Sequence, residues 1–279
     1  MGSPGKTILI TGASDGIGAA SARGLAAKGH RLLVTGRSKQ KLEVIARVTG
    51  AEHFVADFTR LDDVRALAEA VRAALDGQGL EVLANNAGGI FGDRTPTVDG
   101  FEKTLQVNHL APFLLTHLLL NELRAGGGAV INTSSVANRV FGRLDVDDLN
   151  NHQHFSAHRA YGDAKLANIL FTQGLHARYR RQGVASVAFH PGNVATNFAS
   201  DTTSPLRYLY GTWLHRLALI SPERGGATLS WFIEGTPDAT WQSGAYYDER
   251  TLSNQVNLRA TATLADQLWE RSAVMTGVA

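Results

Sequence analysis

The sequence predicts an α/β protein with one domain, residues 1–279, built on a doubly wound parallel β-sheet. Three observations support this prediction. Short apolar runs alternate with longer segments of helical periodicity, and a glycine-rich turn separates the first run from the first helical segment. No linker, low-complexity tract or repeat of solenoid length divides the chain. The six apolar runs lie at 7–10, 31–34, 53–56, 81–84, 129–132 and 184–189.

The six runs are typical of buried strands. Between them, apolar residues recur at spacings of three and four, as in Val64, Leu67, Ala68, Val71 and Leu75. This alternation is the pattern of βαβ units, in which helices cover both faces of a parallel sheet.

Two segments interrupt the alternation. Residues 138–158 form a polar loop before a long helix, and residues 198–221 carry clustered aromatic side chains. Both follow strands, and loops at the carboxyl ends of parallel strands are where such folds bind ligands. We therefore expect both segments to border the functional site.

The composition excludes several functions. A formal net charge of +2 is too small for a nucleic-acid-binding surface, and the absence of cysteine excludes disulfides and thiolate chemistry. The first residues show no signal-peptide hydrophobic region, and the longest apolar stretch, 113–120, is interrupted by His117 and too short to cross a bilayer. We expect a cytoplasmic protein without a membrane anchor.

The turn after the first strand has the composition of a phosphate-binding loop. Glycine lets the backbone turn tightly and approach a pyrophosphate, and the helix that follows directs its free amides toward the phosphates. A purely structural turn is the alternative, and the position between the first strand and the first helix disfavours it. The turn therefore predicts a Rossmann-type dinucleotide site that includes Gly12, Ser14, Asp15, Gly16, Ile17 and Gly18.

The end of the second strand bears on cofactor choice. In dinucleotide folds an acid at this place bonds the ribose 2′-hydroxyl of NAD, but this chain has Gly36 followed by Arg37. Because a guanidinium matches phosphate geometry, Arg37 favours NADP, with NAD as the second possibility. Two readings oppose this: Arg37 as an ordinary surface arginine, and Asp15 as an anion in the phosphate-binding turn.

Tyr161 and Lys165 are the candidate catalytic pair. Their spacing puts a phenol and an ammonium one helical turn apart on the same face. A free tyrosine has a pKa near 10, and a neighbouring ammonium stabilises the phenolate and lowers that pKa. Ser135, at the end of a strand beside the expected nicotinamide pocket, supplies the context that the spacing alone lacks.

These motifs resemble the short-chain dehydrogenase/reductases over nearly the whole chain. The Thr11-Gly12-x-x-x-Gly16-x-Gly18 turn, 85–88 (NNAG), Asn108, Ser135, Tyr161-x-x-x-Lys165 and Pro191-Gly192 occur in the family's order. Segments 107–110, 165–171 and 190–194, and the long interval from Ser135 to Tyr161, are similar to the retinol dehydrogenase and WW-domain oxidoreductase branch. The resemblance implies hydride transfer between a nicotinamide cofactor and an alcohol or carbonyl.

The resemblance also implies roles for individual residues. Tyr161 exchanges the substrate proton, Ser135 orients the substrate oxygen, and Lys165 bonds the nicotinamide ribose. Asn108 holds a kinked helix and a water. Ser135 is preferred to Ser134 because the family's serine stands third after Asn132. The further cofactor residues implied are Asp57 and Phe58 at the adenine, Asn86, Ala87 and Gly88 along the adenosine and ribose, and Pro191, Gly192, Val194 and Thr196 beside the nicotinamide.

Alternatives remain open at this point. A redox sensor or scaffold could bind the dinucleotide without turnover, although it would not need the full set of catalytic side chains. His152, His154 and His158 could bind zinc, but a fourth ligand is missing, so we expect no metal. The resemblance implies a homodimer or homotetramer that acts on a small-molecule substrate, with residues 198–221 as a lid over it. The apolar side chains of this segment suggest a lipophilic substrate.

Overall fold

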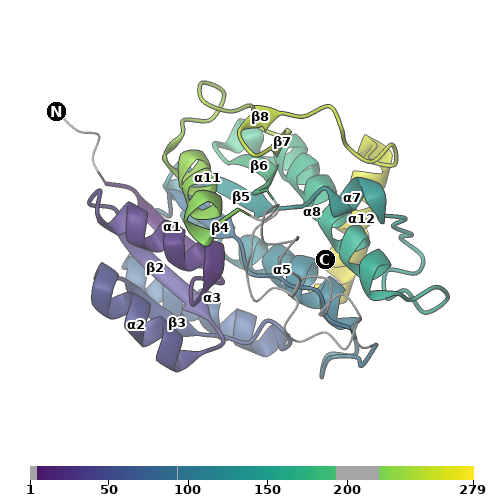
Figure 1. The fold of residues 1–279 in the computed structure, drawn as a ribbon, viewed down its shortest axis with the longest axis horizontal. Coiled ribbons are helices and arrows are strands. Elements are labelled where there is room, and N and C mark those ends of the chain that lie inside the picture. The colour runs from purple at the N-terminus through teal and green to yellow at the C-terminus, as the bar shows by residue number, and fades with distance from the viewer. Residues whose placement is uncertain (1–4, 93, 193–219) are drawn as a thin grey trace.

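The computed structural model describes residues 5–92, 94–192 and 220–279. Its centre is a sheet of eight strands in the order β3-β2-β1-β4-β5-β6-β7-β8 (Figure 1). Neighbouring strands from β3 to β7 pair in parallel, and β8 pairs antiparallel with β7. The predicted fold class is confirmed. The strands are β1 (Thr7–Thr11), β2 (Arg31–Gly36), β3 (Glu52–Val55), β4 (Val82–Asn85), β5 (Ala129–Thr133), β6 (Ala185–His190), β7 (Tyr246–Asp248) and β8 (Thr251–Leu252).

The six predicted apolar runs correspond to β1 through β6, with boundaries shifted by no more than two residues. The prediction that all six are buried is wrong for β3, which lies at the edge of the sheet and is mostly exposed. The strands β7 and β8 were not predicted. They are three and two residues long, too short for a periodic pattern, and they exist because β7 pairs with β6 across a long stretch of chain.

Helices cover both faces of the sheet. On one face lie α1 (Gly16–Ala26), α2 (Lys39–Thr49) and α11 (Pro222–Glu234), and α1 packs beside α11 (Figure 1). On the other lie α3 (Leu61–Leu75), α5 (Ala111–Leu118), α8 (Ala157–Tyr179) and α12 (Ala262–Thr276). Successive residues of β1 show the consequence: Ile8 and Ile10 face the first layer and Leu9 the second, so the strand is apolar throughout.

Shorter helical pieces lie in the connections between these elements. They are α4 (Lys103–Leu105), the π-helical turn η1 (Gln106–Leu110), α6 (Leu120–Ala125), α7 (Ala137–Val140) and the 3₁₀ turn η2 (Arg180–Gln182). The predicted polar loop at 138–158 thus begins inside α7 and ends at Ala157, where Ser156 caps α8 by accepting from the Arg159 amide at 3.2 Å. Of the predicted lid, residues 198–219 lie outside the described residues.

Helix α8 carries the candidate catalytic pair, and residues 160–172 of it are all buried. It is enclosed by α7 and β6 and by α12, whose Trp269 ring lies 5.8 Å from that of Phe171. Such enclosure restricts the rotamers of the side chains that α8 presents. Within the described ranges, no helix has both the length and the apolar character needed to cross a membrane.

Candidate active site and dinucleotide-binding site

The glycine-rich turn between β1 and α1 is a backbone cradle. Gly12 and Gly16 have φ of 66° and 54°, which disfavour a side chain. A Cβ on Gly12 would lie 2.8 Å from the Ala87 Cα, and one on Gly18 would lie 2.5 Å from the Gly12 carbonyl oxygen. The turn therefore fits a ligand that approaches bare backbone, as a pyrophosphate does.

Thr11 ties this turn to the loop after β4. Its Oγ1 accepts hydrogen bonds from the amides of Asn86 and Ala87, both at 3.0 Å, and donates to the Ala84 carbonyl at 3.2 Å. The Asn86 side-chain amide donates back to the Thr11 carbonyl at 3.0 Å. Two of the predicted cofactor residues are thus held beside the turn by a threonine that we did not predict to be part of the site.

Asp15 is paired rather than exposed as a bare anion in the turn. One oxygen accepts from the Gly16 amide at 2.8 Å and so caps α1, and the other lies 2.6 Å from Lys41 Nζ. The charge that argued against NADP therefore has a cationic neighbour, which the sequence pattern did not reveal.

The end of β2 lies directly against the turn. A Cβ on Gly36 would lie 3.0 Å from Ser14 Oγ and 3.2 Å from its Cβ, so a larger residue here would crowd Ser14. The exposed Arg37 follows immediately. The structure thus places the end of β2, and with it the start of the loop that contains Arg37, beside Ser14.

Asp57 and Phe58 follow β3. The Asp57 carboxylate accepts from the Thr59 amide at 3.0 Å and is half-buried, whereas the Phe58 ring is buried in the core. The Phe58 carbonyl accepts from Gln106 Nε2 at 3.2 Å, which connects this loop to η1.

Asn108 lies in η1 and is fully buried. Its amide group donates to the carbonyls of Gly89 and Thr104, both at 2.9 Å, and its Oδ1 accepts from the Gly89 amide at 3.2 Å. The π-helical turn agrees with the kinked helix that the resemblance implied, because π turns interrupt regular α-helical bonding.

The two serines after β5 have different surroundings. Ser134 is buried and donates to the Lys165 carbonyl at 2.7 Å, which fastens the strand end to α8. Ser135 is half-buried, and its Oγ accepts from the Ala137 amide at 3.2 Å. That bond leaves the Ser135 hydroxyl proton available for a ligand oxygen.

Lys165 and Tyr161 lie together in the interior. Lys165 Nζ is 5.4 Å from the centre of the Tyr161 ring and donates to the Thr133 carbonyl at 3.1 Å. The lysine is 2% exposed, and this burial lowers the pKa of its ammonium from 10.5 to about 7. Tyr161 packs against Ile90 and Ala137.

Gly88 marks where the parts of the site meet. A Cβ on Gly88 would lie 2.4 Å from Asn108 Oδ1 and 3.3 Å from Lys165 Nζ. Residues from the loop after β4, from η1 and from α8 therefore surround one point at the carboxyl ends of the strands, although they are far apart in sequence.

The loop after β6 starts at the buried Pro191 and at Gly192, whose φ is 92°. A Cβ there would lie 2.7 Å from Ile220 Cδ1 and 3.5 Å from Glu249 Oε1. The predicted cofactor residues Val194 and Thr196 lie outside the described residues.

The histidine cluster is divided between different partners. His152 Nδ1 lies 3.2 Å from Arg94 Nη2, and the His158 ring lies 5.1 Å from that of Phe141. Among the residues that the structure describes, no group of three or more potential ligands is arranged to hold a metal ion.

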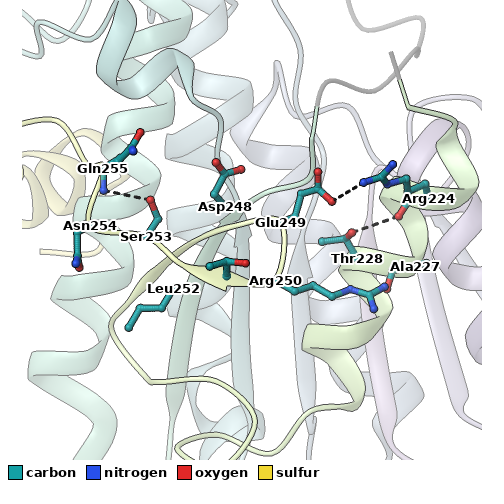
Figure 2. A pocket seen from close by; sticks show the side chains of 11 residues that line it. Arg224, Ala227, Thr228, Asp248, Glu249, Arg250, Leu252, Ser253, Asn254 and Gln255 are labelled. Atoms are coloured by element: carbon teal, nitrogen blue, oxygen red, sulfur yellow. Dashed lines mark hydrogen bonds and ion pairs between the residues drawn. The ribbon is translucent and has the colours of Figure 1, made fainter. Parts of the chain in front are cut away.

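Two surface cavities flank these elements. The larger, about 860 Å³, lies between α11 and the β7–β8 hairpin, where Arg224 pairs with Glu249 at 3.2 Å (Figure 2). It contains none of the predicted site residues, so its size alone does not make it the reaction centre. The smaller, about 390 Å³, is lined by Ser14, Asp15, Gly16 and Lys41 among others and adjoins the phosphate-binding turn.

Known proteins are similar to this chain over most of its length. A family model described as short chain dehydrogenase matches residues 6–206. The curated "Putative daunorubicin C-13 ketoreductase DnrU" of Streptomyces sp. (strain C5) is 42% identical over 99% of this chain and 94% of its own. Human "Retinol dehydrogenase 11" is 33% identical over 99% of this chain and 87% of its own.

Solved structures agree with these matches. A crystal structure of an uncharacterised protein from Mycobacterium paratuberculosis has 30% identity and a TM-score of 0.77, over 98% of this chain and 95% of that one. The NADPH-bound carbonyl reductase from chicken fatty liver has 23% identity and a TM-score of 0.68, over 90% of this chain and 99% of that one. At this identity the likeness supports the fold alone. The predicted resemblance, including that to the retinol dehydrogenase branch, is confirmed.

Proposed function

Since the chain belongs to the short-chain dehydrogenase family and is an oxidoreductase of alcohols or carbonyls, we propose that it transfers hydride between NADP(H) and a lipophilic substrate, with Tyr161 exchanging the proton. The observation that carries this proposal is the convergence of Asn108, Gly88 and Lys165, with the Lys165 ammonium buried above the Tyr161 ring. A redox sensor would have no use for this arrangement.

Each residue has a distinct task in the reduction of a carbonyl. The dinucleotide site would hold a reduced nicotinamide, which would supply a hydride for the carbonyl carbon. The Tyr161 phenol donates its proton to the carbonyl oxygen, so that the product is an alcohol, and oxidation runs through the same groups in reverse. Ser135 donates a hydrogen bond to that oxygen and polarises it.

Lys165 makes the tyrosine a better acid. Its ammonium is desolvated, which strengthens its field at the phenol compared with an exposed pair. In the protein alone, burial lowers the pKa of Lys165 to about 7. An anionic dinucleotide beside it would favour the charged form, so the cofactor and the catalytic ammonium stabilise each other.

Three features around the phosphate-binding turn and the end of β2 favour NADP over NAD. The acid that would bond a ribose 2′-hydroxyl is replaced by Gly36, where a Cβ would crowd Ser14 at 3.0 Å. Arg37 follows with a guanidinium suited to phosphate. Asp15, the opposing anion, is paired with Lys41.

A lipophilic substrate is supported by the surroundings of Tyr161. Two apolar side chains, Ile90 and Ala137, pack on it. The relatives whose names refer to retinol and daunorubicin suggest the same class of substrate.

The test is a cofactor-oxidation screen of aldehydes, ketones, steroids and retinoids with NADPH and NADH, run beside Tyr161→Phe. This variant keeps the ring and loses only the hydroxyl, so cofactor binding should persist while turnover falls by about 10²–10⁴-fold. Retention of more than about a tenth of the wild-type rate would contradict the role of Tyr161. Tight cofactor binding without turnover of any substrate would instead favour the sensor or scaffold.

A further inference from the structure

Lys41 occupies a defined position beside the phosphate-binding turn. It lies in the first turn of α2, which Ser38 caps, and its Nζ is 2.6 Å from Asp15 Oδ2. The other oxygen of Asp15 accepts from the Gly16 amide at 2.8 Å. Because Asp15 caps α1, the ammonium of Lys41 is held against the glycine-rich turn itself.

The same place adjoins the end of β2. A Cβ on Gly36, the last residue of β2, would lie 3.0 Å from Ser14 Oγ. Ser14 also lines the cavity of about 390 Å³, together with Asp15, Gly16 and Lys41. In dinucleotide folds, the adenosine ribose and any 2′-phosphate lie at this strand end. A cation fixed here is within reach of that phosphate.

The local electrostatics favour an additional anion. The first turn of α2 contains no acid, and the positive end of this helix lies next to Arg37. The pair of Lys41 and Asp15 is exposed on both sides, and such pairs contribute little free energy by themselves. An ammonium carries three donors, so Lys41 can bond a phosphate oxygen while it stays with Asp15.

We propose, resting on the NADP preference proposed above, that Lys41 is a ligand of the 2′-phosphate and that Asp15 is its positioning residue. The turn thereby contains an acid and still recognises a phosphate, because the acid holds a cation contributed by α2. Cofactor choice is set by Lys41 together with Arg37.

The test measures binding of the two adenosine halves by calorimetry, which needs neither substrate nor turnover. The probes are 2′,5′-ADP and 5′-AMP, which differ only in the 2′-phosphate. Lys41→Met should lower the affinity for 2′,5′-ADP about 10-fold, which is the lower end of the range for a charge-assisted hydrogen bond. The affinity for 5′-AMP should change by less than about 2-fold. The matched control is Lys39→Met, which removes the same charge from the same helical turn.

Lys39 is a suitable control because its Nζ lies 3.9 Å from Glu43 Oε1 and so pairs within its own helix. Its replacement should leave both affinities within about 2-fold, since a distant exposed charge is screened by salt. Equal losses of 2′,5′-ADP affinity in the two variants would refute a specific contact and leave only a general effect of positive charge.

A second comparison separates a direct bond from simple neutralisation of Asp15. Asp15→Asn keeps an oxygen that can accept from the Gly16 amide but removes the negative charge. In the Asp15→Asn protein, Lys41→Met should still lower the affinity for 2′,5′-ADP several-fold. If the loss disappears there, Lys41 acts only by compensating Asp15, and the proposed contact is wrong.

The two proposals fail in different ways. If wild-type protein binds 2′,5′-ADP and 5′-AMP equally well, the NADP preference itself is refuted, and the role of Lys41 with it. The other result is that the wild type prefers 2′,5′-ADP, that Arg37→Ala removes this preference, and that Lys41→Met leaves it unchanged. In that case only the role of Lys41 is refuted.

Discussion

Replacing Lys165 by methionine should stabilise the cofactor-free protein near pH 7 while it abolishes turnover. Burial lowers the pKa of this ammonium from 10.5 to about 7, so the folded protein holds the charge at a cost. Its donor bond goes to the Thr133 carbonyl at 3.1 Å, and the same carbonyl accepts from Asn168 Nδ2 at 3.0 Å. Methionine therefore removes the charge without leaving that carbonyl unpaired.

The magnitude follows from the two pKa values. Between pH 7 and 10.5 the unfolded chain holds more protons at this position than the folded one, so wild-type stability rises with pH. At about 1.4 kcal/mol per pKa unit, the buried ammonium costs on the order of 4 kcal/mol at pH 7 and about 1 kcal/mol at pH 9.5. The advantage of Lys165→Met should thus shrink by about 3 kcal/mol over this interval.

Urea unfolding of both proteins between pH 6 and 9.5, without cofactor, measures this difference. Subtraction of the two stabilities cancels the titration of groups that both proteins share. The difference should be nearly constant below about pH 6.5, where both states of Lys165 hold the proton, and should decline above pH 7. A difference that stays the same from pH 6.5 to 9.5 would refute the link between the burial of Lys165 and its protonation.

Three further predictions concern the cofactor, the substrate and the core. Arg37→Ala should remove most of a 10- to 150-fold preference for NADPH over NADH while NADH affinity changes little, as fluorescence titration would measure; equal wild-type affinities would contradict this. In a series of straight-chain aldehydes, kcat/KM should rise about three- to four-fold per added carbon until the pocket is full, because each buried methylene contributes about 0.8 kcal/mol; a flat profile would argue against an apolar substrate pocket. Trp269→Ala should lower the free energy of unfolding by about 3–5 kcal/mol, since its ring packs 5.0 Å from that of Phe113 and 5.8 Å from that of Phe171; a loss below about 1 kcal/mol in denaturant melts would mean that α12 is not fixed by this contact.

The sequence alone was sufficient for the parts of the molecule that depend on nearby residues. Strands β1, β2, β4, β5 and β6 are largely apolar runs because helices bury both of their faces, whereas the edge strand β3 is mostly exposed. The glycine-rich turn and the pair of Tyr161 and Lys165 are equally local, since one depends on backbone φ and the other on helical spacing. The cytoplasmic location, the homo-oligomer and the lid at 198–221 stay predictions.

The tertiary structure decided which distant residues became neighbours. Asp15 pairs with Lys41, which is 26 residues away in the sequence. This ion pair weakens the argument that the acid in the turn disfavours NADP. Gly88, Asn108 and Lys165 surround one point because the loop after β4, the turn η1 and helix α8 pack against one another there. The pKa of Lys165 likewise depends on how completely the surrounding elements exclude water from it, and not on the residues beside it in the chain. Such properties follow from packing over long sequence separations, for which a single sequence carries no periodic signal.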